Sequence, residues 1–252
     1  MKTEFEWKSF IKNIAVIAIP VALQNLLATT GSMVDTIMLA SLGEKTVGAV
    51  GLCAQFSSLM FSCYWGFVGG GMLFFSQYWG AGDKDGIDRS YGITLTFMMS
   101  VAAVFTILAA GFPETAMSIY TDKEEIRQIG VRYLKIVGFA YPLQILAMAM
   151  SALLRSIERV KIPLIGGIAS VLTNFCINYI LIFGKFGFPR LGVRGAAIGT
   201  ICAGAMNLLV ICVFVIKNHI PFIFDVNRHF KWTRSVLREY LQKCFPIICN
   251  EL

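Results

Sequence analysis

Long apolar segments separated by short polar ones run along most of this chain. A helix of about 20 apolar residues crosses the roughly 30 Å hydrocarbon core of a bilayer. On that criterion the pattern predicts six membrane spans, at residues 14–40, 47–78, 91–112, 129–153, 162–183 and 194–216. We therefore expect an all-α polytopic membrane protein, made of a six-helix transmembrane bundle and the start of a seventh helix.

Two of these spans have features of their own. The second is longer than a bilayer requires, and either a tilt of the whole helix or a break near Gly69–Gly71 accommodates the excess. The first continues to Leu42 without a convincing small-residue cleavage site. It is therefore expected to stay in the membrane rather than to be removed as a signal peptide.

Composition agrees with a membrane protein. Hydrophobic residues make up 56% of the chain and charged residues only 15%, and the mean hydropathy is +0.68. The net charge of +7 does not indicate nucleic acid, because no basic patch is interleaved with aromatic residues. In a membrane protein an excess of Lys and Arg normally belongs to cytoplasmic loops. The expected partner is therefore the lipid bilayer, with no nucleic acid.

The Lys and Arg residues also predict the orientation. With the N-terminus inside, fourteen of the 22 lie on the cytoplasmic side, including Arg155, Arg159 and Lys161 between the fourth and fifth spans. Eight lie on the opposite side. This bias favours a multi-pass protein of the plasma membrane with a cytoplasmic N-terminus.

The segment after the sixth span is polar and basic. Between His219 and Lys243, four apolar residues recur at helical spacing: Trp232, Val236, Leu237 and Tyr240. Either a surface helix on anionic lipid or a solvated linker helix fits this pattern. We therefore divide the chain into a transmembrane lobe at 1–217, a cytoplasmic amphipathic linker at 218–243, and the start of a C-terminal lobe at 244–252.

A short internal sequence similarity supports that division. The segment from Phe245 to Glu251 resembles the segment from Ile19 to Asn25, since in each a proline is followed by three apolar and two polar residues. Parallel repeats of six-span halves occur in transporters. This similarity therefore suggests that these 252 residues form the first half of a larger architecture.

Asp35 is the principal chemical anomaly, because this carboxylate lies within the apolar run from Ile14 to Leu42. An ionisable group at membrane depth costs at least about 2.5 kcal/mol and usually faces a cavity where it handles an ion or a proton. The alternative is a carboxylate near the interface that is merely solvated.

Other polar residues are expected at the depth of Asp35. At 1.5 Å per residue, Asn174, Asn178 and Thr200 fall in the same outer half of the membrane, and the two asparagines share a helix face. Gln55, Ser57 and Ser58 of the second span lie at similar depth. Carboxylate, amide and hydroxyl oxygens suit a hard cation such as Na⁺, or a proton. Alternatively, Asn, Thr and Ser serve only as hydrogen-bonding glue between helices.

At these residues the chain resembles the multidrug and toxic compound extrusion (MATE) family of cation-coupled exporters. The resemblance covers the whole chain, as the N-terminal six-helix lobe plus the opening of the seventh helix. The stretches that carry it are Ile19–Pro20, Val34–Met38, Phe75–Ala81, Leu153–Ser156 before Pro163, Asn174–Asn178 and Gly195–Thr200.

The resemblance implies an antiporter, not an enzyme, which exports organic cations or other drugs against inward Na⁺ or H⁺ flow. It implies that Asp35 couples transport to the ion, that Asn174, Asn178 and Thr200 complete the site, including for Na⁺, and that Pro20 lets the first helix bend. No cofactor is implied beyond the coupling ion. Some members carry an acid at the position of Asn178, which leaves the choice of ion open.

The same resemblance implies a substrate cavity and a second lobe. The candidate cavity residues are Gln24, Gln55, Tyr141 and Glu251, and the cavity is expected to hold one acid among neutral polar groups. A single acidic side chain in the cavity favours a cationic substrate. The usual central cleft also needs a C-terminal lobe.

Two other readings remain open at this stage. A flippase for lipid-linked oligosaccharides shares the two-lobe architecture but favours basic residues in its cavity. A non-transporting fragment or accessory subunit is the other alternative. Serine and zinc enzymes are disfavoured because His219 and His229 lie outside the spans and neither H-E-x-x-H nor G-x-S-x-G occurs.

Overall fold

The computed structural model describes residues 7–218, 220 and 234–251. Within those ranges every regular element is a helix, which confirms the predicted all-α class. The helices are α1 (Trp7–Ala40), α2 (Glu44–Ala81), α3 (Lys84–Gly111), α4 (Pro113–Ser118), α5 (Glu124–Val137), α6 (Ala140–Ser156), α7 (Lys161–Phe183), α8 (Val193–Lys217) and α10 (Arg234–Glu251).

Five of the described helices are long and apolar enough to cross a membrane by themselves: α1, α2, α3, α7 and α8. Helices α5 and α6 form a sixth span if they are counted together, although they meet at an angle of 52°. The span predicted at 129–153 is thus a pair of helices with a bend between them. At the bend, the hydroxyl of Thr106 in α3 donates a hydrogen bond of 3.1 Å to the carbonyl oxygen of Gly138.

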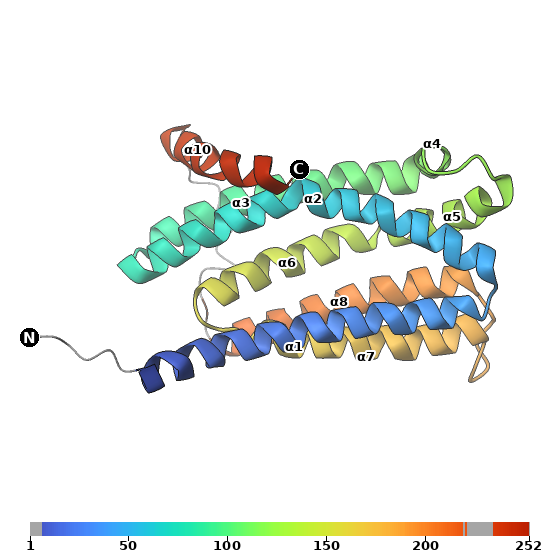
Figure 1. Cartoon of the computed structure of the whole chain (residues 1–252), viewed down its shortest axis with the longest axis horizontal. Coiled ribbons are helices and arrows are strands. Elements are labelled where there is room, and N and C mark those ends of the chain that lie inside the picture. The colour runs from blue at the N-terminus through green and yellow to red at the C-terminus, as the bar shows by residue number, and fades with distance from the viewer. Residues whose placement is uncertain (1–6, 219, 221–233, 252) are drawn as a thin grey trace, which may run out of the picture.

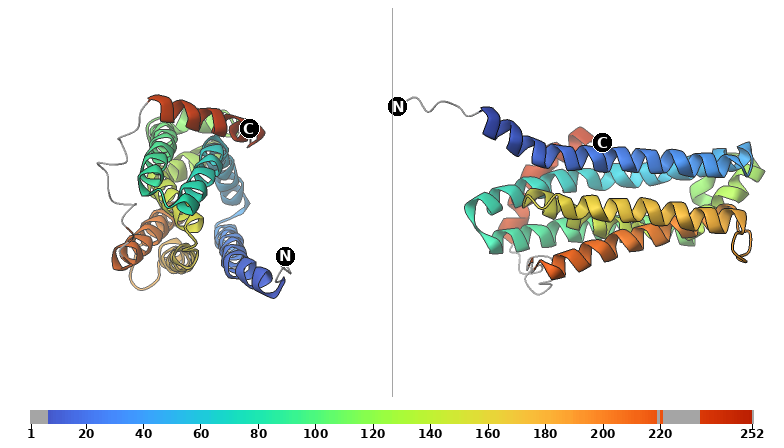
Figure 2. Two further views of the ribbon diagram at one scale, coloured as in Figure 1. Left: turned by 90° about the vertical axis from the view of Figure 1, so that its left-hand side faces the viewer. Right: turned by 90° about the horizontal axis from the view of Figure 1, so that it is seen from below.

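The helices form two groups that run side by side (Figure 1). One group contains α2, α3 and α6, and the other contains α1, α7 and α8 (Figures 1 and 2). The first group holds most of the core, in which aromatic and sulfur-containing side chains are almost fully enclosed: Met60, Tyr64, Phe75, Tyr91, Met98 and Tyr141. Helix α6 also packs on α8 and so joins the two groups.

Helix α2 runs unbroken from Glu44 to Ala81, so the alternative of a break near Gly69–Gly71 is wrong. Two of these glycines instead permit close approaches by neighbouring helices. A Cβ atom on Gly70 would lie 2.1 Å from the sulfur of Cys244, and one on Gly71 would lie 2.7 Å from the hydroxyl oxygen of Thr94. The glycines therefore serve packing rather than flexibility.

Helix α10 lies across α2 and α3 (Figure 1) and is continuous through the boundary predicted between residues 243 and 244. The Tyr240 hydroxyl is 2.8 Å from that of Thr94 and donates to the Phe67 carbonyl oxygen at 3.2 Å. Leu237 and Cys244 pack beside it. This apolar face thus contacts the helix bundle, whereas the sequence suggested lipid or solvent; Trp232 lies outside the described residues.

Helices α7 and α8 form the most extensive helix pair of the described structure. Gly195 and Gly199 lie on the α8 side of this contact, four residues apart, as in the small-residue pattern that brings membrane helices together. A Cβ atom on Gly195 would lie 2.8 Å from the backbone of Leu181. Only glycine fits this spacing, and it brings α8 close enough for its side chains to reach those of α7.

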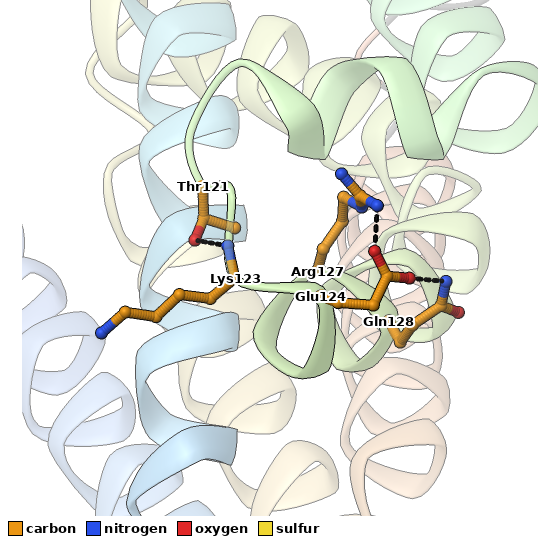
Figure 3. Close-up of polar contacts among 5 residues, drawn as sticks. All are labelled: Thr121, Lys123, Glu124, Arg127 and Gln128. Atoms are coloured by element: carbon orange, nitrogen blue, oxygen red, sulfur yellow. Dashed lines mark hydrogen bonds and ion pairs between the residues drawn. The ribbon is translucent and has the colours of Figure 1, made fainter.

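Charged side chains organise the end of the bundle where α5 begins (Figure 3). Glu124 accepts hydrogen bonds from Arg127 and, at 2.7 Å, from Gln128, while the Thr121 hydroxyl accepts one from the backbone N–H of Lys123. These contacts fix the first turn of α5. They lie far along the chain from Asp35 and take no part in its site.

Candidate functional site: a polar cavity around Asp35

A cavity of about 520 Å³ lies among α1, α2, α6, α7 and α8. Its wall is mostly apolar, but it includes two charged residues, Asp35 from α1 and Arg155 from the last turn of α6. Neutral polar side chains complete the lining, among them Gln24, Gln144, Asn174, Thr200 and Asn207.

Asp35 is held by helix α7. The Asn178 side-chain nitrogen donates a 2.8 Å hydrogen bond to Oδ1 of Asp35 and a 3.0 Å hydrogen bond to Oδ1 of Asn174. Asn178 is only 1% exposed, whereas Asn174 and Asp35 both reach the cavity. The i, i+4 spacing of the two asparagines places both amides beside one carboxylate.

Asn174 has a second hydrogen-bonding arrangement. If its amide is turned over, the nitrogen donates to Oδ2 of Asp35 at 3.1 Å and lies 2.5 Å from Oδ1. An amide that donates suits an ionised carboxylate, and an amide that presents its oxygen suits a carboxyl that carries a proton. The same oxygen also suits a hard cation held jointly with the carboxylate.

Helix α8 closes the site from the other side. A Cβ atom on Gly199 would lie 1.9 Å from Oδ1 of Asn178, so only glycine leaves room for this amide. Thr200 lines the cavity, and its hydroxyl donates to the carbonyl oxygen of Ala196 at 3.1 Å. Its oxygen still has lone-pair capacity for another partner.

Tyr133 is a member of the site that sequence reasoning missed. Its phenol group, on α5, interacts with the Thr200 hydroxyl and electrostatically with Asp35. A tyrosine in an amphipathic stretch gives no signal of this kind, because its ring fits a core as well as a site. Helices α1, α5, α7 and α8 therefore all contribute to the surroundings of Asp35.

The structure gathers some of the predicted residues and separates others. Asp35, Asn174, Thr200 and Gln24 line the cavity, and Gln24 Nε2 donates to the carbonyl oxygen of Pro163 at 3.4 Å. Asn178 lies directly behind them. Pro20 lies inside α1, one turn before Gln24, and the helix is continuous through it.

Gln55 and Tyr141, which were also expected in a substrate cavity, do not line this one. Gln55 is exposed on another face of α2. Tyr141 is 1% exposed and its hydroxyl lies 3.0 Å from that of Ser57, so both belong to the core between α2 and α6. Ser58 is also exposed. The Glu251 side chain lies outside the described residues.

Arg155 also lines the cavity. The sequence pattern placed it on the cytoplasmic side after the fourth span, and the structure places it in the last turn of α6. The cavity therefore does not hold one acid among neutral groups. It carries one acidic and one basic side chain, and the Leu153–Ser156 stretch that marked the family resemblance was the available signal.

Known proteins resemble this chain in sequence and in fold. A profile of the MatE family matches residues 20–180. The probable multidrug resistance protein YoeA of Bacillus subtilis (strain 168) is 27% identical over 242 residues, which cover 95% of this chain and 52% of that protein. A probable multidrug resistance protein NorM of Thermotoga maritima is also 27% identical, covering 93% of this chain and 50% of that protein.

Among solved structures, one described as MATE in the straight conformation matches with a TM-score of 0.81 at 20% identity, covering 95% of this chain and 53% of that chain. The chain spans about half the length of the curated relatives it matches. The family profile covers more than half of the described bundle, including the stretch from Asp35 to Asn178. This chain is a multi-pass membrane protein that belongs to the multidrug and toxic compound extrusion family.

Proposed function

We propose that the chain forms one lobe of a cation-coupled antiporter that exports drugs, including organic cations, from the cell. The observation that carries this proposal is the Asp35 carboxylate, held by Asn178 on the wall of a polar cavity. Among the described residues Asp35 forms no ion pair, so its charge is available to a mobile cation. The names of the relatives, which refer to multidrug resistance, support the export of drugs.

The coupling ion is Na⁺ or H⁺. Asp35 would carry the negative charge, while Asn174, Asn178 and Thr200 contribute neutral oxygens within reach of the same space. A proton on Asp35 pairs with the oxygen of Asn174, and an ionised Asp35 pairs with its nitrogen. The amide of Asn174 therefore adapts to both charge states without a change in the backbone.

Movement of α1 would link ion binding to transport. Most contacts of this helix are with α7, and fewer are with α2 and α8, so α1 is packed less closely than the other long helices. Pro20 removes one backbone hydrogen bond inside α1 and provides a place to bend. Related MATE structures described as straight and bent, with TM-scores of 0.81 and 0.79, support a lobe with two shapes.

A complete transporter requires a second lobe opposite the cavity. The relatives are about twice as long as the part this chain matches, which supports a partner lobe of similar size. We propose that the assembled protein lies in the plasma membrane with its N-terminus in the cytoplasm. A cation entering from outside would displace a cationic drug from Asp35 and shift the balance between inward- and outward-facing states.

The test is drug efflux by the protein expressed from its complete gene and reconstituted in lipid vesicles. We expect Asp35→Asn to abolish the dependence of efflux on an imposed Na⁺ or H⁺ gradient, because the neutral side chain cannot exchange charge. Asp122→Asn, in an exposed loop, is the matched control and should behave as wild type. Gradient-driven efflux that survives Asp35→Asn would disprove the coupling role.

One observation favours the second candidate, a flippase for a lipid-linked oligosaccharide. Arg155 places a positive charge on the cavity wall, and a flippase needs basic groups for the phosphates of its substrate. The antiporter remains the better supported function, because Asp35 at the other end of the cavity would repel those phosphates. A vesicle assay for lipid translocation that shows activity independent of Asp35 would reverse this order.

A further inference from the structure

A groove of about 610 Å³ lies between α5 and the start of α8, and it shares no lining residue with the cavity around Asp35. Three basic and three apolar residues line it: Arg132, Lys135, Arg194, Val131, Ile136 and Phe139. Among the described residues no acid contributes to this lining. We call this feature the α5–α8 groove. Its composition suits a ligand that is anionic at one end and apolar at the other.

The three basic side chains of the α5–α8 groove lack partners within the protein. Each is exposed, and within the ranges that the structure describes none forms an ion pair or a side-chain hydrogen bond. The acids at the start of α5 are engaged elsewhere, since Glu124 pairs with Arg127 and Glu125 pairs with Lys45. The positive charge of the groove is therefore available to a ligand that comes from outside the protein.

A role in helix stability does not account for the charge of Arg194. This residue lies in the first turn of α8, where the partial positive charge of the helix N-terminus disfavours a cation. The same turn holds no acid that would offset the charge. Three like charges around one groove also repel one another. An anion bound among them would relieve that repulsion.

The α5–α8 groove runs from one end of the bundle towards its middle. Helices α5 and α8 both begin at that end (Figure 1), and Arg194 lies in the first turn of α8. Phe139 lies at the bend between α5 and α6 and is 58% exposed. Since α8 is long enough to span a membrane, its first turn lies near the lipid headgroups and the bend lies deeper. The long side chains of Arg132 and Lys135 can extend towards the headgroups while their stems stay on apolar surface.

We propose that the α5–α8 groove binds a phospholipid whose headgroup carries a net negative charge. Arg132 and Arg194 hold the phosphate, because a guanidinium group binds phosphate through two parallel hydrogen bonds, and Lys135 adds a further positive charge. An acyl chain lies along Ile136 and Phe139. A lipid with a zwitterionic headgroup is a weaker ligand, because its own cationic group meets three unneutralised cations. The proposal does not depend on the coupling role of Asp35.

The test measures lipid binding by native mass spectrometry, with the protein expressed from its complete gene and purified in detergent. Phosphatidylglycerol, which is anionic, and phosphatidylcholine, which is zwitterionic, are titrated separately with the same acyl chains. We expect the first phosphatidylglycerol to bind at least about tenfold more tightly than the first phosphatidylcholine, since each cation near a lipid phosphate strengthens binding. Equal apparent dissociation constants for the two lipids overturn the proposal.

Substitutions of the basic residues locate the site. Arg132→Gln, Lys135→Gln and Arg194→Gln should each weaken the first phosphatidylglycerol about fivefold and leave phosphatidylcholine unchanged. The combined variant should bind the two lipids equally, and the single variants decide if it does not fold. The matched control removes the same charge from exposed residues at the same end of the bundle: Lys123→Gln, Lys185→Gln and Arg190→Gln. An equal loss of phosphatidylglycerol binding in the control overturns the site, because diffuse charge would then explain it.

Two further measurements test whether the ligand is a lipid rather than a soluble anion. Phe139→Ala should weaken phosphatidylglycerol about threefold, because the acyl chain loses apolar contact. Phe112→Ala is the matched control, since Phe112 is also 58% exposed, and it should leave binding unchanged. Glycerol phosphate, which has no acyl chains, should not displace the lipid at about hundredfold excess. Displacement by glycerol phosphate, or an unchanged affinity in Phe139→Ala, overturns the assignment to a lipid.

Discussion

Helices α1 and α3 look alike in sequence but differ sharply in how they are held. Both are apolar and long enough to cross a membrane, yet none of the most apolar window of α1 is buried, against 33% of that of α3. Helix α3 packs on α2, α5 and α6, while α1 contacts chiefly α7. Polar contacts at Asp35 and Gln24 therefore contribute more to the position of α1, beside a small apolar cluster at Met38 and Leu39, whereas extensive van der Waals packing holds α3.

This difference matters for function because packing and polar contacts respond differently to an ion. A close-packed interface changes little when charge changes nearby. A helix that is positioned by a carboxylate changes its contacts with the neighbouring helices when that carboxylate gains a proton or a cation. In the proposed mechanism α1 is the moving part and α2, α3 and α6 form the fixed frame, and four predictions test this difference.

The largest expected effect comes from a matched methionine pair. Met98 of α3 is 0% exposed and Met33 of α1 is 62% exposed. We expect Met98→Ala to lower the free energy of unfolding by about 3 kcal/mol, through the cavity it leaves. Met33→Ala should change it by less than about 0.5 kcal/mol. Unfolding in mixed detergent and SDS, followed by circular dichroism, measures both, and equal losses would contradict the comparison.

Gly199→Ala should have the next largest effect, about 2 kcal/mol, because the new methyl group would overlap the Asn178 amide that holds Asp35. Gly51→Ala in α2 is the matched control, since nothing lies within 4 Å of its added Cβ. That substitution should be neutral or stabilising by up to about 1 kcal/mol. The same unfolding assay applies, and a silent Gly199→Ala would show that α7 and α8 are less closely packed.

Tyr240→Phe should cost about 1 kcal/mol, because the hydroxyl bonds both to Thr94 and to the carbonyl oxygen of Phe67. The ring itself stays stacked on Phe74, at 5.2 Å between centroids. Thr94→Val removes the partner, and the double variant should cost little more than either single one. Additive losses in this double-mutant cycle would mean that the two hydroxyl groups do not interact.

Pro20→Ala should have the smallest effect on stability, below about 1 kcal/mol, because prolines are tolerated in membrane helices. Its effect should appear in the shape of α1. Spin labels at Ile11 and Ile37, which are 60% and 70% exposed, bracket the proline. We expect a narrower distance distribution once the missing backbone hydrogen bond is restored. An unchanged distribution would remove Pro20 as a bending point.

Sequence reasoning succeeded where one segment carries the whole signal. Long apolar runs predicted the spans because hydrophobic length is a local property, and Asp35 drew attention because a carboxylate is costly at that depth. The pairing of Asn174 and Asn178 followed from helical periodicity alone. To predict their contact with Asp35 it was enough that residues on two helices lie at the same depth in the membrane.

Sequence reasoning failed where the structure depends on contacts between segments that are far apart in the chain. Pro142 lies in the first turn of α6, just after the bend, and cannot donate a backbone hydrogen bond to the carbonyl oxygen of Gly138, which accepts one from Thr106 of α3 instead. The bend also lies where Gly138 meets α3, since a Cβ atom on Gly138 would lie 2.8 Å from that of Ala109. Arg155 was placed after the fourth span because charge marks the end of a span, although the helix carries it to the cavity wall. Tyr141 is the opposite case, because its side chain carries a polar hydroxyl group and yet is enclosed in the core.

The contact between Gly70 and Cys244 gives this protein a built-in reporter. The thiol of Cys244 is 0% exposed while α10 lies on α2. A maleimide should therefore label Cys244 only when α10 lifts from the glycine. The labelling rate of Cys244, measured against a Cys244→Ala control, would report how often that helix leaves the bundle.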